Sequence, residues 1–208
     1  MTKTDLERIC EAVRDKMVQE CDYLVSLDAR NGDGDLGLTM RDCWTAVAEA
    51  VRTAQTEDLG TVLLQCAQSA NRAAPSTMGT ITSFWLMGAA RALRGETEVT
   101  IEAFADALAA GIENICAKAG SKAGDKTMLD ALIPAVSSLK EHAGEGAAAA
   151  AEAACEAAKG GAESTRNMVS KHGRAAYYGE KSFGLVDGGA VAAAMIFEAV
   201  GEIFRTAK

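Results

Sequence analysis

The chain has 208 residues, of which 49% are hydrophobic and only 5% aromatic, so it can bury a substantial aliphatic core. Its formal net charge of -8 argues against nucleic acid as a partner, because phosphate backbones are bound by basic patches. The polar N-terminus is unlike a signal peptide and no apolar run approaches the roughly 20 residues that span a bilayer. The six cysteines form no CxxC pair, so we expect free thiols and a cytoplasmic location.

Helical periodicity begins close to the N-terminus. Thr4 and Glu7 are spaced as a capping box, and apolar residues then recur at helical intervals as far as Leu24. Similar apolar faces follow farther along the chain. The first four helices are expected over residues 4–24, 40–51, 58–71 and from about 78 onward.

The second half of the chain contains four further predicted helices. N-capping side chains or an alanine-rich composition mark their starts at Thr100, Asp125, Ala147 and Asp187. The helix after Asp125 contains Pro134 and must accommodate it. The alanine-rich helix is expected to reach Lys171, and the last helix to end near Arg205. Residues 172–186 are polar and rich in glycine, and are predicted to form a loop.

The pattern of elements predicts an all-α protein. No stretch alternates with period two, so no β-sheet is expected. Eight helices joined by short connections indicate antiparallel neighbours in an up-and-down helical barrel or bundle. We expect this architecture to form a single domain over residues 1–208.

An aspartate-rich loop separates the first two predicted helices. Asp28, Asp33 and Asp35 place three carboxylates within eight residues, and Gly32 and Gly34 let the backbone curl so that the oxygens converge. Such a cluster is costly to hold together without a cation. Hard cations such as Mg²⁺ bind carboxylate oxygens and keep water and phosphate as further ligands. A solvated turn with incidental acidic residues is the alternative.

A calcium loop of the EF-hand type is a second alternative. Asn31, Asp33 and Asp35 match its alternating ligands. However, Leu36 stands where that loop needs glycine, and its twelfth position holds Asp42 rather than Glu. The residues therefore favour a magnesium site over a calcium loop.

Three other segments could contribute to a phosphate site. Residues 73–80 combine small and hydroxyl side chains before a helix, where free N–H groups attract anions, although an ordinary capped turn has the same composition. Lys126 could meet phosphate, and Arg174 could form a bidentate contact with it. His172 could act as a base, but it has no visible partner and is expected to face solvent. These patterns alone do not identify the reaction that such a site would catalyse.

Three motifs give the chain a recognisable resemblance. The segments LDARNGDGDLGLTM, GDKTMLDALIPAV and KHGRAAYYGEKSFGLVDGGA resemble the L subunit of dihydroxyacetone kinase (DhaL) in order and spacing, from about residue 20 to 206. The resemblance implies a barrel of eight antiparallel helices with Mg-nucleotide bound on the loops at one end. Asp28, Asp33 and Asp35 would hold the metal, expected to be two Mg²⁺ ions, and would act with Arg174 in catalysis.

The resemblance also implies a set of nucleotide contacts. They fall on Leu36, Gly37, Leu38, Thr39, Ala73, Ala74, Ala119, Met128, Arg174, Asp187, Gly188 and Gly189. This chain departs from the family at several of these positions: Leu36 replaces a histidine, Gly188 a proline and Ala119 a glycine. Arg72-Ala73-Ala74-Pro75 replaces the usual Gly-Ala-Ser-Gly, so that Ser76 or Thr77 would supply the displaced hydroxyl.

The resemblance implies a phosphotransfer subunit of a dihydroxyacetone-type kinase that uses ATP or ADP. The acceptor would be a short ketose or triose held by a separate K-type subunit, and the donor either ATP or a phosphotransferase-type M subunit. A homodimer is a further expectation. The altered positions motivate a second hypothesis, a non-catalytic ADP-binding regulatory module. The third is a structural protein with an acidic loop.

Overall fold

The computed structural model describes residues 1–206, and this part consists of helices and their connections without a β-strand. The α-helices are α1 (Lys3–Gln19), α2 (Cys21–Asp28), α3 (Leu36–Thr53), α4 (Leu59–Ala73), α5 (Thr77–Ala92), α6 (Ile101–Ala119), α7 (Leu129–Glu141), α8 (Ala147–Ser164) and α9 (Gly188–Thr206). Short 3-10 helices are η1 (Ala143–Glu145), η2 (Thr165–Asn167) and η3 (Arg174–Ser182). The predicted domain, 1–208, stays a prediction, and its last two residues lie outside the described part.

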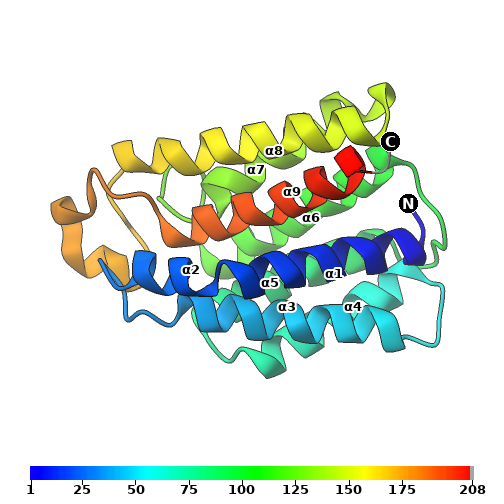
Figure 1. The fold of residues 1–208 in the computed structure, drawn as a ribbon, viewed down its shortest axis with the longest axis horizontal. Helices are drawn as coiled ribbons and strands as arrows, with labels where there is room; N and C mark the ends of the chain where they lie inside the picture. The colour runs from blue at the N-terminus through cyan, green and yellow to red at the C-terminus, as the bar shows by residue number, and fades with distance from the viewer. Residues whose placement is uncertain (207–208) are drawn as a thin grey trace.

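The helices form a closed ring. From α3 to α9 each packs against the next one in the chain, α1 packs against α3, and α9 returns to α1. Figure 1 shows the long axes of α8, α9, α1 and α3 lying along one direction. The predicted up-and-down barrel is therefore confirmed, with α1 and α2 together occupying the place of one predicted helix.

The N-terminal helix differs from the prediction in two details. Its capping box is formed by Thr2 and Asp5 rather than Thr4 and Glu7: Thr2 N–H donates to Asp5 Oδ2 over 2.9 Å. Both pairs have the same spacing, and the chain uses the earlier one. The helix is also interrupted at Glu20, where ψ of 9° departs from helical geometry before α2 begins.

Two predicted boundaries in the second half were wrong. The helix expected from Asp125 begins at Leu129, because the Asp125 side chain is engaged by other groups described below. The alanine-rich helix ends at Ser164 rather than Lys171. There, Thr165 Oγ1 donates to a carbonyl of α8 and accepts the N–H of Asp187, which turns the chain away. Thr100 and Asp187 do cap helices as predicted, α6 and α9.

The segment 165–187 contains more structure than the predicted loop. Its central part is η3, interrupted at Gly179, where φ is 51° and ψ is -129°. Gly173 and Gly184 on either side also have positive φ. Such backbone is readily adopted only by glycine, so this segment is a series of tight turns.

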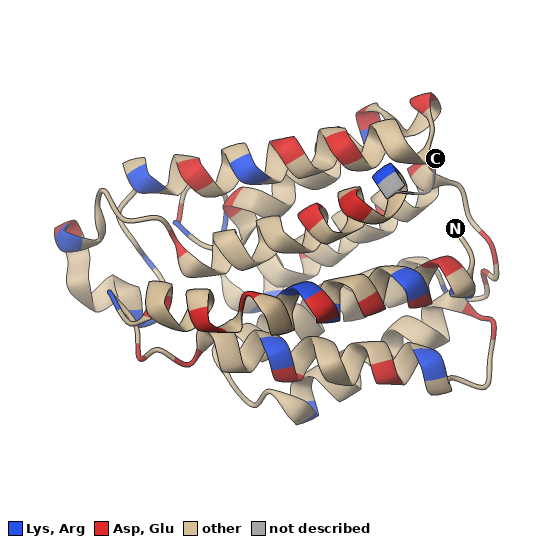
Figure 2. Cartoon of the chain, viewed as in Figure 1, with Lys and Arg blue, Asp and Glu red and all other residues tan. Residues whose placement is uncertain are grey.

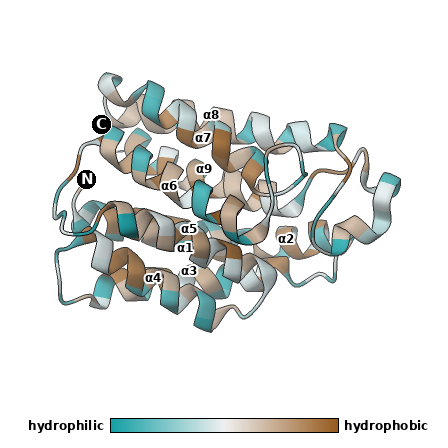
Figure 3. Cartoon of the chain, turned by 180° about the vertical axis from the view of Figure 1, so that it is seen from behind, coloured by the Kyte–Doolittle hydropathy of each residue, from teal (hydrophilic) through white to brown (hydrophobic). Residues whose placement is uncertain are grey.

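The core of the ring is aliphatic, as the composition predicts. Buried side chains such as Val13, Met40, Val47 and Leu132 have none of their surface exposed, and the helices contain most of the strongly hydrophobic residues (Figure 3). Charged residues are spread along the lengths of α1 and α8 (Figure 2). Among residues 1–206, no helix is long and apolar enough to cross a membrane. The cytoplasmic location stays a prediction.

Candidate functional site

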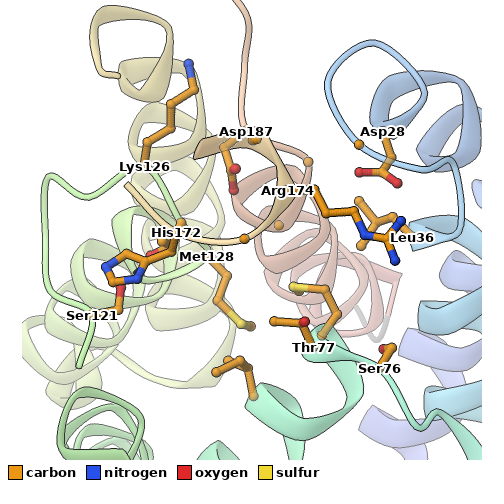
Figure 4. A pocket seen from close by; sticks show the side chains of 18 of the residues that line it. Asp28, Leu36, Ser76, Thr77, Ser121, Lys126, Met128, His172, Arg174 and Asp187 are labelled. Atoms are coloured by element: carbon orange, nitrogen blue, oxygen red, sulfur yellow. Dashed lines mark hydrogen bonds between the residues drawn. The ribbon is translucent and has the colours of Figure 1, made fainter. Parts of the chain in front are cut away.

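Four connections between helices meet at one end of the ring. They span residues 29–35, 74–76, 120–128 and 165–187. From α2 onward, successive helices run in opposite directions, so every second connection returns to the same end. Residues from these connections and from the adjoining helix ends line a cavity of about 510 Å³ (Figure 4).

Three aspartates lie together at one side of this cavity. Each of Asp28, Asp33 and Asp35 offers a carboxylate oxygen within 4.8 Å of the others. Asp28 Oδ2 accepts the N–H of Gly34 over 2.8 Å, and a positive φ of 76° at Gly34 makes that turn possible. A Cβ at Gly32 would lie 2.1 Å from Asp28 Oδ1, so no side chain fits there. The loop thus requires its glycines to bring the carboxylates together.

The aspartate cluster carries concentrated negative charge. Burial, followed by the charges of Asp33 and Asp28, raises the pKa of Asp35 above its ordinary value. Arg174 offsets part of this charge, because its Nη1 lies 2.6 Å from Asp33 Oδ2. Three converging carboxylates with no nitrogen or sulfur ligand match the preference of Mg²⁺. These residues therefore fit a magnesium ion and bring the predicted Arg174 beside it.

The start of α5 forms a second wall. Pro75, Ser76 and Thr77 line the cavity, and Ser76 caps the helix by accepting a backbone N–H over 3.2 Å. Ala73 and Ala74 do not line it. Ala73 ends α4 and is exposed, whereas Ala74 is buried. The family-based assignment of nucleotide contacts to these two alanines thus falls outside the cavity, whereas Ser76 and Thr77 lie within it.

The starts of α3 and α9 pack against each other. Leu36 lines the cavity, but Gly37, Leu38 and Thr39 do not: Leu38 faces solvent and the other two are buried. A Cβ at Gly188 would lie 2.7 Å from Leu36 Cδ2. Leu36 therefore occupies space that a side chain at residue 188 would need, so these two departures from the family pattern are in contact.

The first turn of α9 presents backbone N–H groups. Asp187 Oδ2 accepts the N–H of Ala190 over 2.8 Å and so caps the helix. Removal from water raises the pKa of Asp187 to about 6, although its hydrogen bond to Ala190 and the charge of Lys126 act in the opposite direction. Gly188 and Gly189 line the cavity, and their contact with a nucleotide stays a prediction.

An apolar surface completes the cavity. The predicted Met128 and Ala119 line it together with Met78, Ile81 and Ile115. The last three were missed as cavity residues because each belongs to an apolar helical pattern that it shares with neighbouring core residues. Their contribution depends on where a helix ends relative to the cavity, which periodicity does not reveal.

A family model described as the DAK2 domain matches residues 30–202. The chain belongs to the DAK2 domain family. It is 35% identical over 178 residues to an L-erythrulose 1-kinase of Mycolicibacterium smegmatis, a match that covers 85% of this chain and 31% of that protein. It is 28% identical over 173 residues to the ADP-binding subunit DhaL of the PEP-dependent dihydroxyacetone kinase of Escherichia coli, covering 82% of each chain.

Solved structures agree with this membership. The dihydroxyacetone kinase of C. freundii in complex with AMP-PNP and Mg²⁺ superposes with a TM-score of 0.75 at 28% identity, over 95% of this chain and 33% of that one. This DAK2 domain thus spans about a third of the length of some relatives and most of the length of DhaL. The resemblance to DhaL predicted from the motifs is confirmed.

The sequence left two roles open for Lys126, a phosphate contact or a solvated side chain. In this DAK2 domain it has neither role. It is buried, with φ of 61°, and its Nζ donates to the carbonyls of Met168, Ser182 and Leu185 over 3.1, 2.5 and 2.6 Å. Burial lowers its pKa. The residue is a structural tie between connections 120–128 and 165–187, and Figure 4 shows its side chain directed away from the other labelled residues.

The sequence suggested that His172 faces solvent without a partner. The structure instead shows it in contact with Asp125. Its Nε2 lies 3.1 Å from Asp125 Oδ2, and the residue lines the cavity. Asp125 Oδ1 also accepts from Lys171 Nζ over 2.8 Å. The lysine, other hydrogen bonds and the histidine lower the pKa of Asp125 to about 2 despite its burial. These contacts link residues far apart in sequence, so no local spacing predicts them.

Proposed function

We propose that this DAK2 domain binds a Mg-adenine nucleotide in the cavity and transfers a phosphoryl group to a small hydroxyketone or triose carried by a separate K-type subunit. The convergence of Asp28, Asp33 and Asp35 within 4.8 Å carries the proposal. The acceptor class is supported by the relatives, whose names include kinases of dihydroxyacetone and L-erythrulose.

The groups around the cavity have distinct roles in this proposal. Asp28, Asp33 and Asp35 would hold one or, as we propose, two Mg²⁺ ions, which when bound neutralise phosphate charge. Arg174 would leave Asp33 and form a bidentate contact with a phosphate. Gly188 and Gly189 line the cavity at the positive end of α9, where the helix dipole would stabilise an anion.

The opposite wall suits the base. Met128, Ile115 and Met78 offer an apolar surface against which an aromatic ring can lie. Burying the base there would fix the phosphates at the aspartates. The resulting geometry would leave the terminal phosphate at the mouth, where a partner can present its sugar.

The phosphoryl donor could be free ATP or a phosphoprotein that recharges bound ADP. The E. coli relative is named as an ADP-binding subunit of a PEP-dependent kinase, whereas L-erythrulose 1-kinase is a longer chain. We propose that this domain works with a separate K-type subunit, which its similarity to the DhaL subunits supports.

The decisive test is substitution of one aspartate. We expect Asp33→Asn to abolish detectable Mg-ADP binding in calorimetric titration, because a carboxamide cannot replace a charged ligand of Mg²⁺. Asp22→Asn, an exposed position on α2, makes the same change in charge and should leave binding unchanged. Dihydroxyacetone phosphorylation with an added K-type subunit should be lost in parallel.

Other results would point to the alternatives. Tight ADP binding without transfer to any partner-held ketose would favour a regulatory module, which the contact of Leu36 with Gly188 beside the aspartates motivates. If calorimetric titration detected no binding heat with either Mg-ADP or Mg-ATP, only a structural role would remain.

A further inference from the structure

The cavity has two chemically different sides. Figure 4 shows Asp28 and Leu36 on one side and His172 and Ser121 on the other, with Met128 between them. If the phosphates lie at the aspartates, as the proposed function requires, the length of a nucleotide places its base toward His172. The inference below rests on that placement.

A buried carboxylate fixes the orientation of His172. Asp125 is 3% exposed, and each of its oxygens is engaged: Oδ1 by Lys171, and Oδ2 by both His172 Nε2 and the N–H of Lys122 over 3.0 Å. The backbone N–H of Lys171 also donates to the Asp125 carbonyl over 3.2 Å. Both ends of the contact are thus held, and the imidazole is fixed at the wall of the cavity.

The same contact determines which ring nitrogen carries hydrogen. Asp125 is ionised at neutral pH, because the pKa of its carboxyl is about 2. An ionised carboxylate can only accept hydrogen bonds, so Nε2 of His172 must be the donor. In the neutral ring, Nδ1 then carries a lone pair. Among residues 1–206, no protein group hydrogen-bonds Nδ1, so it remains available to a ligand.

Neighbouring polar groups do not distinguish one base from another. Ser121 and Thr127 line the same part of the cavity, and their hydroxyl oxygens lie 3.4 Å apart. Hydroxyl groups rotate, and each can donate or accept. Of these three side chains, the imidazole, with its tautomer fixed by Asp125, is the one that presents a directed acceptor.

We propose that His172 selects adenine in this cavity, with its Nδ1 accepting a hydrogen bond from the 6-amino group of the base and Asp125 acting as the positioning residue. A 6-oxo purine presents an acceptor to the same atom, so two lone pairs would face each other. A site built around one hydrogen bond rejects an analogue that leaves its polar group unpaired.

The test compares ADP with IDP, which carries oxygen in place of the 6-amino group. Calorimetric titrations with saturating Mg²⁺ should give at least about tenfold tighter binding of ADP to the wild-type protein. In His172→Ala this ratio should fall close to one through loss of ADP affinity. Lys171→Met is the matched control, because Lys171 contacts the same carboxylate but does not line the cavity. It should keep the wild-type ratio.

Asp125→Asn gives a second and sharper result. An amide can donate to Nε2, which would move the ring hydrogen to Nδ1 and favour IDP over ADP. The ¹⁵N spectrum of the imidazoles reports this change directly, and His142→Gln identifies the only other histidine. A change in the protonated nitrogen would separate positioning from a purely structural role, which would alter thermal stability alone.

The possible failures are distinguishable. Equal binding of ADP and IDP by the wild-type protein, or an unchanged ratio in His172→Ala, would overturn the role of His172 while leaving the nucleotide site intact. If the wild-type protein bound neither nucleotide, the proposed function would fail and the base assignment with it.

Discussion

Single charged residues around the cavity are balanced in three different ways. Asp33 is paired with the side chain of Arg174, which is 66% exposed. Asp125 is buried and shared between Lys171 and His172, and Lys126 is buried among carbonyl groups. Only the first arrangement leaves both partners accessible to a ligand. Arg174 is thus the charged side chain best able to change partner when a nucleotide binds.

Removing Arg174 tests that inference. We expect Arg174→Ala to weaken Mg-ATP binding by about 10- to 100-fold, which corresponds to the loss of charge-assisted hydrogen bonds. Arg174→Lys should recover only part of the affinity, because it restores charge without the planar fork. Calorimetry provides the measurement, and Lys181→Ala, an exposed residue in the same segment, provides the control. Unchanged affinity in Arg174→Ala would contradict the phosphate role.

Asp125 should confer a pH-dependent contribution to stability. Its pKa is about 2 in the folded protein, below the ordinary 3.8. The unfolded chain therefore binds the proton more readily, and the contribution is fully present above about pH 4 and lost as pH falls toward 2. In denaturant unfolding, the stability difference between wild type and Asp125→Asn should shrink over that interval. A constant difference would indicate that the carboxylate charge is unimportant.

At the scale of elements, α7 and α8 approach closely where a proline interrupts the usual hydrogen bonding. Pro134 lies within α7 and has no N–H, so the carbonyl of Asp130 lacks its intrahelical donor. Gly161 of α8 packs against this carbonyl: a Cβ there would lie 2.2 Å from Asp130 O. The ring can therefore close at this contact only if residue 161 has no side chain.

Neighbouring glycines in α8 make a matched comparison. Gly161→Ala should lower the free energy of unfolding by about 1–3 kcal/mol, the usual cost of overpacking. A Cβ at Gly160 meets nothing within 4 Å, so Gly160→Ala should instead raise it by about 0.5–1 kcal/mol through helix propensity. Thermal or denaturant unfolding distinguishes the two, and equal effects would refute the close contact.

Element boundaries were predictable where local capping governs them. Thr100 and Asp187 cap α6 and α9 through contacts within three residues, which a sequence pattern can reveal. The start of α7 after Asp125 and the end of α8 at Ser164 depend instead on tertiary contacts. Their partners, Lys171, His172 and Asp187, are distant in sequence. Tertiary contacts there override local helix preference.

For the whole molecule, periodicity and short connections predicted a helical barrel or bundle, and the resemblance to DhaL implied the barrel. The same resemblance implied that the aspartate loop, the start of α5 and the start of α9 contribute to one site. The tie formed by Lys126 was not predictable, because its left-handed backbone and three carbonyl partners have no local sequence signature. It joins two connections into one unit.

Loss of this tie should loosen one side of the cavity. Lys126→Met removes three hydrogen bonds and should lower stability by roughly 3 kcal/mol, with faster hydrogen exchange across residues 165–187. Lys118→Met, at an exposed position on α6, should alter neither measurement. If exchange in that segment stayed at the wild-type rate, the tie would have no structural importance.

The alternation of connections along the ring has an evolutionary consequence. Each connection at the cavity end belongs to a different pair of successive helices. A change in the length or chemistry of one such connection leaves the helix pairing of the other three unaltered. New acceptors or nucleotides could thus be accommodated by exchanging connection 29–35 or 74–76 alone, or the tied connections 120–128 and 165–187 together, while the packing that closes the ring is inherited unchanged.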